Sequence, residues 1–289
     1  MTIFEFRLAL DIGFDSKAKM LKQHTKQMSN SSYLFVDSSN GYCYLFDKNG
    51  KEQDIHSLTK IDNALFYEDT ALAKIVVPSS VTSIGNSAFC DCHGLTSVSI
   101  PDSVTNIESN AFGNCSRLMN VTIPNSMTSM GDHVFYNCSR LMSVTIPDSM
   151  TSTEDWTFSS CSGLTSVTIP ASVTNIGKWV FIGCCRLTSV AIPDSVTSIG
   201  SWAFSGCSGL ASITIPNNVM SIGDNAFYNC SGLASVTIPD SVTSIGDWAF
   251  RYCSKLTKMT FKGKTLDKVK AMENYPFGIE DESVIKCEA

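Results

Sequence analysis

The sequence has little charge of either sign, few histidines and no long apolar run, and these absences exclude several classes of protein. Lys and Arg number 21 against 27 Asp and Glu, and no basic tail or cluster stands out. Nucleic acids and anionic lipid surfaces attract clustered Lys and Arg, so we expect neither as the main partner. No apolar stretch approaches the roughly 18–20 residues of a transmembrane helix, so we predict no membrane span.

Signatures of catalysis and of metal binding are also missing. The four histidines are scattered along the chain and form no Ser/His/Asp arrangement. Cys90, Cys92 and His93 read C-x-C-H, but no second half with zinc-ligand spacing follows. We therefore predict no enzyme, no cofactor and no metal site. An enzyme with its site in residues 1–55 is the least favoured alternative, because that segment is short and poor in candidate residues.

What the chain does have is a block of 23 residues that recurs through most of its length. Pro101 to Ile123 reads PDSVTNIESNAFGNCSRLMNVTI, and it returns, lightly edited, at every multiple of 23 residues. Proline opens each of eight consecutive copies, at Pro78, Pro101, Pro124, Pro147, Pro170, Pro193, Pro216 and Pro239. A fixed period without insertions is typical of a solenoid, in which each unit packs only on its neighbours.

Apolar spacing predicts the path of one coil, counted from its proline as position 1. Leu118, Val121 and Ile123 at positions 18, 21 and 23 indicate a short strand, and positions 4 and 7 a second extended piece. Ala111, Phe112 and Cys115 at positions 11, 12 and 15 predict one helical turn with these side chains inward. Glycine recurs at position 8, which predicts a bend with positive φ.

Eight of the 12 cysteines occupy position 15. Equivalent residues on stacked coils lie about 5 Å apart, close enough for a disulfide in principle. A continuous inward row cannot pair without disturbing the stack, and free cysteine packs as a small hydrophobe. We predict a ladder of buried thiols.

The period also divides the chain. We predict an N-terminal cap over 1–55 with a β-hairpin turning near Asn40-Gly41, and a short basic helix from Ser16 to Met28. Residues 56–77 form a degenerate first repeat, with Asp69 in the cysteine position. Eight repeats follow over 78–261, and 262–289 form a C-terminal cap with a helix from Thr265 to Glu273.

The third and fourth repeats depart most from the pattern. Met127, Met130 and Met150 replace branched residues, and Thr153 puts a hydroxyl where isoleucine recurs. We predict that backbone amides exchange fastest there among the repeats.

The coil C-x-x-L-x-x-V-x-I-P-x-x-V-x-x-I-G-x-x-A-F, as in Cys207 to Phe227, resembles the BspA-like leucine-rich repeat family. The resemblance implies a leucine-rich-repeat solenoid, a right-handed arc with a parallel β-sheet on its concave side. It also implies protein binding or adhesion at microbial cell surfaces. We expect an extracellular matrix protein, a host protein or a glycan as partner. We expect a monomer.

Two surfaces are candidates for partner binding. Trp156, Trp179, Trp202 and Trp248 share position 10, which predicts an exposed tryptophan column on the convex side. Mutual stacking that only stiffens the coils is the alternative interpretation. Strand positions 20 and 22 should face the concave side with small hydroxyl side chains, and the threonines at position 22 are Thr122, Thr145, Thr168, Thr214 and Thr237.

Two hypotheses for the cellular location of the protein remain. The segment MTIFEFRLALDIGFDSKAK has no basic start, and charges interrupt its apolar residues, so it is a poor secretion signal. The family resemblance favours a cell-surface or secreted protein, whereas this segment favours an intracellular scaffold or spacer.

Overall fold

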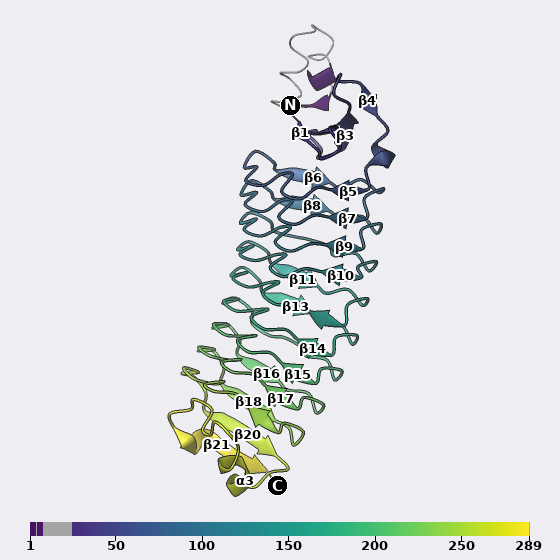
Figure 1. Cartoon of the computed structure of the whole chain (residues 1–289). Helices are drawn as coiled ribbons and strands as arrows, with labels where there is room; N and C mark the ends of the chain where they lie inside the picture. Colours follow the sequence, from purple (N-terminus) through teal and green to yellow (C-terminus); the bar gives the residue numbers. More distant parts are fainter. Residues whose placement is uncertain (4, 8–24, 289) are drawn as a thin grey trace. The chain divides into compact units, whose positions relative to one another are not determined.

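The computed structural model describes residues 1–3, 5–7 and 25–288 and shows a parallel β-solenoid with turns of roughly 23 residues (Figure 1). The predicted fold class is confirmed. The chain divides into two compact units, Met1–Val134 and Phe135–Ala289, and the boundary falls inside one sequence repeat.

An antiparallel sheet opens the first unit. Its strands are β1 (Lys26–Gln27), β2 (Tyr33–Val36), β3 (Cys43–Phe46) and β4 (Glu52–Gln53), followed by the 3-10 helix η1 (Ile55–Ser57). β2 and β3 form the predicted hairpin, with Gly41 at φ 84° in its turn. The Gly41 carbonyl accepts a hydrogen bond from the Val76 N–H at 2.8 Å, which holds the hairpin against the first repeat strand.

The predicted basic helix from Ser16 to Met28 is wrong where it can be checked. Lys26 and Gln27 form β1 and pair with β2. The rest of that prediction, up to His24, lies outside the described residues.

Two sets of short parallel strands run through the repeats of the first unit. β6 (Lys74–Val76) and β8 (Ser97–Ser99) pair in one sheet, and β5 (Lys60–Ile61), β7 (Ser83–Ile84), β9 (Asn106–Ile107) and β10 (Ser129–Met130) pair in another. Partners in the register are 23 residues apart, as Lys74 is from Ser97. Both extended pieces expected from the apolar spacing are therefore present.

The second unit repeats this arrangement. Its leucine-side strands are β11 (Ser143–Thr145), β13 (Ser166–Thr168), β16 (Ser212–Thr214), β18 (Ser235–Ile238) and β20 (Lys258–Lys262). The other sheet contains β12 (Ser152–Thr153), β14 (Asn175–Ile176), β15 (Ser198–Ile199), β17 (Ser221–Ile222) and β19 (Ser244–Ile245).

Phenylalanine and cysteine fill the interior of both units. Phe66, Phe89 and Phe112 stack at 5.1 Å between ring centroids in the first unit. In the second unit, successive rings from Phe135 to Phe250 stack at 5.1–5.8 Å. All eight position-15 cysteines are buried free thiols, so the predicted ladder is confirmed.

Ladder thiols also donate hydrogen bonds to backbone carbonyls, which the sequence alone does not predict. The Cys207 thiol donates to the Phe181 carbonyl at 3.2 Å, and the Cys230 thiol donates to the Phe204 carbonyl at 3.1 Å. The same bond links residues 26 apart wherever it recurs along the ladder. The thiols thus connect neighbouring coils as well as filling space.

The predicted helical turn at positions 11–15 is wrong, because the segment is a run of tight turns. Positions 10 and 14 take left-handed backbone angles, for example Trp179 at φ 56° and Asn229 at φ 55°. This alternation turns N–H groups toward the next coil, so the Phe204 N–H donates to the Ala226 carbonyl at 2.8 Å. The backbone is therefore hydrogen-bonded between coils, which a helix would prevent.

The predicted positive φ at position 8 is also wrong. The glycines with positive φ lie elsewhere, at Gly41, Gly50, Gly183, Gly206, Gly263 and Gly278 among the described residues. At Gly200 an added Cβ would lie 2.7 Å from the backbone carbon of Gly177 in the preceding coil. Close approach of the coils, and not a bend, therefore selects glycine at this position.

The C-terminal segment closes the second unit. α3 (Leu266–Lys270) is shorter than predicted; the Thr265 side chain caps its N-terminus and Val269 is buried. The 3-10 helix η2 (Glu282–Val284) follows and leads into β21 (Ile285–Glu288). β21 pairs in parallel with β20 and extends the sheet by one strand that the sequence analysis missed.

Candidate functional site

Side chains at positions 20 and 22 form what we call the strand face. Thr145 lies opposite Thr168, and Thr214 opposite Thr237, in register on neighbouring parallel strands. Thr145, Thr168 and Thr214 are exposed and Thr237 is half-buried. In the first unit Thr122 is exposed but lies outside any strand, where only a bridge at Asn120 continues the sheet.

Most other hydroxyl rows bond to the neighbouring coil. At position 19 the Thr165 hydroxyl donates to the Met142 carbonyl at 3.0 Å, and at position 5 the Thr197 hydroxyl donates to the Thr174 carbonyl at 3.2 Å. At position 3 the Ser195 hydroxyl donates to the Val173 carbonyl at 2.6 Å. The five strand-face threonines make no side-chain hydrogen bond within the described part of the chain, so their hydroxyls are available to a partner.

The tryptophan column is less exposed and less continuous than predicted. Trp156 and Trp179 stack with ring centroids 4.8 Å apart, whereas Trp202 contacts Tyr228 at 5.5 Å. These three indoles are half-buried, and Trp248 is 51% exposed. Because stacking covers ring faces, the column presents mainly edges to solvent.

An aromatic and cationic cluster at the C-terminal end of this column was not predicted. The Arg251 guanidinium carbon lies 5.0 Å from the Trp248 ring centroid and 4.8 Å from that of Tyr252. Tyr252 also meets the edge of Tyr228 at 5.2 Å. Arginine at position 13 and tyrosine at position 14 recur in none of the other repeats, so periodicity carried no signal for this cluster.

The buried thiols are chemically quiet at neutral pH. Burial raises the pKa of Cys161 to about 12, and the pKa of Cys184 lies well above its usual range, mainly because of burial. Since the thiolate is the reactive form, the ladder is suited to packing and not to nucleophilic chemistry.

The described residues contain no group of three or more His, Cys, Asp or Glu placed to hold a metal ion. No helix within 1–3, 5–7 and 25–288 has the length and apolar character needed to span a bilayer.

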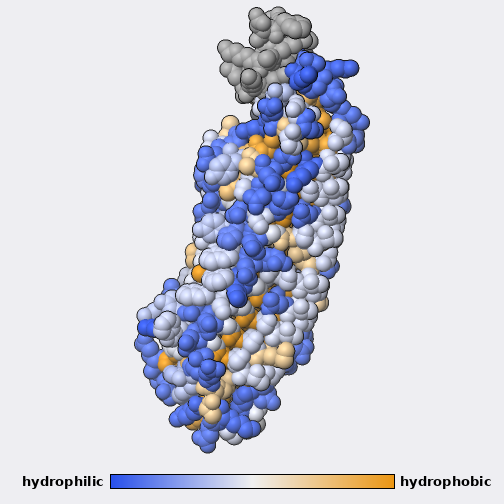
Figure 2. All heavy atoms as spheres, in the orientation of Figure 1, coloured by the Kyte–Doolittle hydropathy of each residue, from blue (hydrophilic) through white to orange (hydrophobic). Residues whose placement is uncertain are grey.

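The surface is weakly polar over much of the repeats. On the face in view, Figure 2 shows broad pale areas, the colour of residues near the middle of the hydropathy scale, beside patches of strongly hydrophilic side chains and a narrower run of hydrophobic ones. Serine and threonine, which line the strand face, belong to the pale class. The surface therefore offers many weak contacts and few charges to a partner.

Comparison with known proteins places these features in a family. A model of the BspA type leucine-rich repeat region matches residues 59–186 and 180–278. A leucine-rich cell surface protein from Faecalibacterium prausnitzii A2-165 is 28% identical with a TM-score of 0.54, over 74% of this chain and 65% of that protein, so this chain spans slightly less than two thirds of that relative.

A leucine-rich repeat protein from Bacteroides ovatus ATCC 8483 is 23% identical with a TM-score of 0.63, over 90% of this chain and 76% of that one, and supports the fold. A comparison with curated proteins finds no significant match.

Proposed function

Because the chain belongs to the family of BspA-type leucine-rich repeat proteins, we propose that it is a non-enzymatic scaffold that binds an extended protein partner along its strand face. The observation that carries this proposal is the contrast between hydroxyl rows. Positions 3, 5 and 19 bond to neighbouring coils, whereas the threonine hydroxyls at position 22 make no such bond among the described residues.

The geometry of the strand face suits an extended polypeptide. Where strands pair, as Thr145 with Thr168 and Thr214 with Thr237, its hydroxyls repeat about every 4.8 Å, the spacing of parallel strands. Ala191 interrupts the row between the two pairs. Each contact to a neutral hydroxyl is weak, but contacts repeated along the paired strands of one unit act together and bind more tightly than any one of them alone. The near absence of charge fits adhesion that depends on shape and hydrogen bonding more than on electrostatic attraction.

A location at the cell surface is part of the proposal. It is supported by the relative described as a leucine-rich cell surface protein. The second hypothesis is an intracellular scaffold or spacer. Fractionation of the source cell and protease treatment of intact cells distinguish the two, since only a surface protein is cleaved without lysis.

The strand face is tested by adding charge to it. The immobilised chain is compared with the variant Thr145→Glu/Thr168→Glu/Thr214→Glu for retention of candidate extracellular matrix and host proteins. These side chains are exposed, so the fold should tolerate the change. We expect retention of a genuine partner to fall at least about tenfold, because the partner would have to desolvate three carboxylates.

A matched control carries the same charge change on another side of the coil. Ser149, Ala171 and Asn217 are exposed and lie at positions 2 or 3. Retention should be unchanged when these three become glutamate. Equal loss in both variants would show that charge alone, and not the strand face, governs binding.

The tryptophan column is a second candidate surface. Four tryptophans occupy left-handed backbone angles of 53–61°, a conformation that asparagine adopts more readily and that Asn110 and Asn225 adopt in other repeats. Replacing Trp156, Trp179 and Trp202 by serine tests this surface. Undiminished binding would leave the column a purely structural role.

A further inference from the structure

The last regular coil, residues 239–261, is covered by the C-terminal segment over part of its C-terminal side and is open in one place. The Phe250 N–H donates to the Phe277 carbonyl at 3.0 Å, and β20 pairs with β21. Between these two contacts lie positions 14–18 of the coil. Cys253 is 8% exposed there, whereas the seven earlier ladder cysteines are fully buried. Leu256 is half-buried, although the equivalent leucines from Leu95 to Leu233 are fully buried.

The backbone at this opening has lost its usual partner. The position-14 N–H donates to the position-13 carbonyl of the next coil, as Gly206 does to Tyr228 and Asn229 does to Arg251, both at 2.8 Å. The Tyr252 N–H, the next in this series, has no acceptor among the described residues. The segment that covers Phe250 passes close to Arg251 at Gly278, where φ is 85°, and then makes a local turn in which the Ile279 N–H donates to the Pro276 carbonyl at 3.0 Å.

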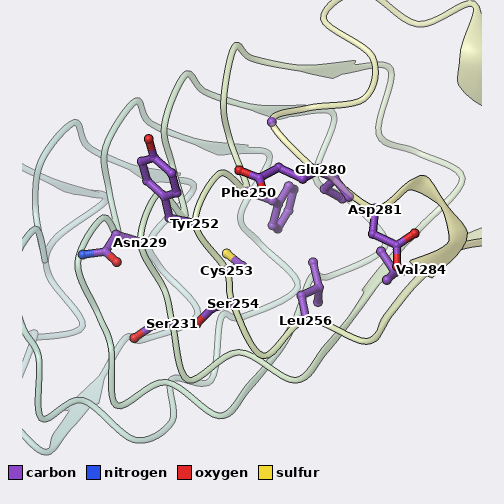
Figure 3. Close-up of a pocket in the computed structure, with 12 residues that line it drawn as sticks. Asn229, Ser231, Phe250, Tyr252, Cys253, Ser254, Leu256, Glu280, Asp281 and Val284 are labelled. Atoms are coloured by element: carbon purple, nitrogen blue, oxygen red, sulfur yellow. The ribbon is translucent and has the colours of Figure 1, made fainter.

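The opening is a cavity of about 480 Å³ with an apolar floor and an acidic rim (Figure 3). Leu256, Ile279 and Val284 contribute apolar surface; Glu280 extends from the C-terminal segment toward Phe250 and the side of Tyr252, whereas Asp281 extends from it in the other direction, beside Val284. Both carboxylates belong to exposed residues, and no lysine or arginine lines the cavity. Hydrogen bonds from Ser283 and, to a smaller extent, the nearby Lys286 lower the pKa of Asp281 by stabilising its carboxylate, so the charge that a cation would complement comes mainly from Glu280.

We propose that this cavity binds a lysine or arginine side chain of a partner protein. The aliphatic stem would lie on Leu256, Ile279 and Val284 while the cationic head meets Glu280, and Asp281 adds to the negative charge of the rim. The partner's backbone carbonyl would accept the Tyr252 N–H, replacing the carbonyl that the next coil supplies elsewhere. A long basic side chain uses both the apolar floor and the acidic rim, whereas a neutral sugar gains little from the floor.

The neighbouring cluster fixes one wall of the cavity. The Arg251 guanidinium carbon, 4.8 Å from the ring centroid of Tyr252, and the edge contact with Tyr228 hold the Tyr252 ring in place. A held wall lowers the ordering cost of binding. None of the strand-face threonines lines the cavity, so this proposal is tested independently of the proposed function.

The test uses the full chain and the peptide acetyl-Ala-Lys-Ala-amide as probe, with acetyl-Ala-Gln-Ala-amide and cellotetraose for comparison. Binding is followed by chemical shifts of the backbone amides. We expect the lysine peptide to shift the Tyr252 amide and to bind more tightly than the glutamine peptide. Glu280→Gln/Asp281→Asn should weaken it about tenfold, the effect of removing two exposed negative charges. Asparagine still caps η2 as Asp281 does for the Ser283 N–H.

Two variants distinguish binding in this cavity from non-specific electrostatic attraction of the cationic peptide to the acidic chain. Asp148→Asn/Asp194→Asn removes the same charge from exposed residues far along the sequence and should leave the affinity within twofold. Ser254→Trp fills the cavity from an exposed lining residue and should abolish binding without changing the net charge.

Equal weakening by both acid-to-amide pairs, or equal affinity for the lysine and glutamine peptides, would overturn the proposal. If cellotetraose bound and the lysine peptide did not, and if Ser254→Trp removed the cellotetraose binding, the cavity would be a saccharide site instead. Absence of any binding would also overturn the proposal.

Discussion

Two rows of aromatic side chains run along the repeats only two positions apart, and they differ in what holds them. The inner row, phenylalanine at position 12, is buried in every repeat and stacks ring on ring in both units. The outer row, position 10, has tryptophan in four repeats and Ser87, Asn110, His133 or Asn225 in the others. Burial alone accounts for the inner row, whereas the outer row needs another reason for its tryptophans.

The backbone sharpens this difference. Position 10 takes a left-handed angle in every repeat from Ser87 to Trp248, so a tryptophan there is in an unfavourable conformation. The stack of Trp156 on Trp179 offsets part of that cost, and the half-exposed Trp248 meets Arg251 in a cation–π contact. The inner row is thus selected by packing, and the outer row by its contacts at the surface.

The largest expected effect comes from ionising the thiols that lie beside the inner row. Burial raises the pKa of the ladder thiols above the usual value of 9.0, for Cys161 to about 12. Between these values the unfolded chain has lost protons that the folded chain keeps, so stability is complete below pH 9 and falls as the pH rises. Each thiol should cost about 1.4 kcal/mol per pH unit. Circular dichroism between pH 8 and 11 should show cooperative unfolding, with thiolate absorbance rising in step.

Removing thiols should make the alkaline transition less steep. Cys184→Ala/Cys207→Ala should lower the pH dependence of the unfolding free energy by about 1.4 kcal/mol per pH unit for each thiol. Cys185→Ala, at the exposed neighbour of Cys184, is the control and should leave it unchanged. An identical slope in all three proteins would mean that tyrosine or lysine titration drives the unfolding.

Truncation within the inner row should have the next largest effect. Phe204 is fully buried between Phe181 and Phe227, at 5.4 and 5.5 Å between centroids. Phe204→Ala should lower the free energy of unfolding by about 3–5 kcal/mol, because the neighbouring coils cannot close the cavity. Urea unfolding measures the loss, and Phe204→Leu should lose less. A loss below about 1 kcal/mol would mean that the stack is not a principal source of stability.

The inner row and the thiol ladder could be predicted because burial repeats with the sequence period. The local backbone could not, since the i, i+1, i+4 spacing of Ala111, Phe112 and Cys115 fits a helical turn as well as two tight turns. Only the hydrogen bonds to the next coil decide between them. β21 and the acidic cavity lie where Ile285 and Glu280 no longer follow the period, so the sequence contained no signal for either.

A smaller effect is expected at the repeat that starts at Pro147. The hydroxyl oxygen of Ser159 is buried without a hydrogen-bond partner among the described residues. Thr153, by contrast, is satisfied, since its hydroxyl accepts from the Gly177 N–H at 2.9 Å. Ser159→Ala should therefore stabilise the chain by about 1–2 kcal/mol, whereas Thr153→Val should destabilise it. Urea unfolding of both variants measures whether the unfolding free energy rises for Ser159→Ala and falls for Thr153→Val.

Hydrogen exchange compares the same region with the other repeats. Met127, Met130 and Met150 are buried where branched side chains recur elsewhere, and methionine packs less rigidly. We expect amides over residues 124–169 to exchange faster than those over 193–238. Ser159→Ala should slow exchange in the repeat from Pro147. Uniform protection over 78–261 would contradict this prediction.

The smallest effect is expected in the outer row, where the loss of stacking energy and the relief of backbone strain nearly cancel. Replacing Trp179 by asparagine removes the stack on Trp156, a loss of about 0.5–1.5 kcal/mol. It also relieves the left-handed backbone angle of 56°, a gain of about 1 kcal/mol. The net change in unfolding free energy should thus stay within about 1 kcal/mol. Trp179→Ala loses the same stack without that relief and should be less stable than Trp179→Asn. If both variants lost as much as Phe204→Ala, tryptophan would be as much a packing residue as the phenylalanine beside it, and the distinction between the two rows would fail.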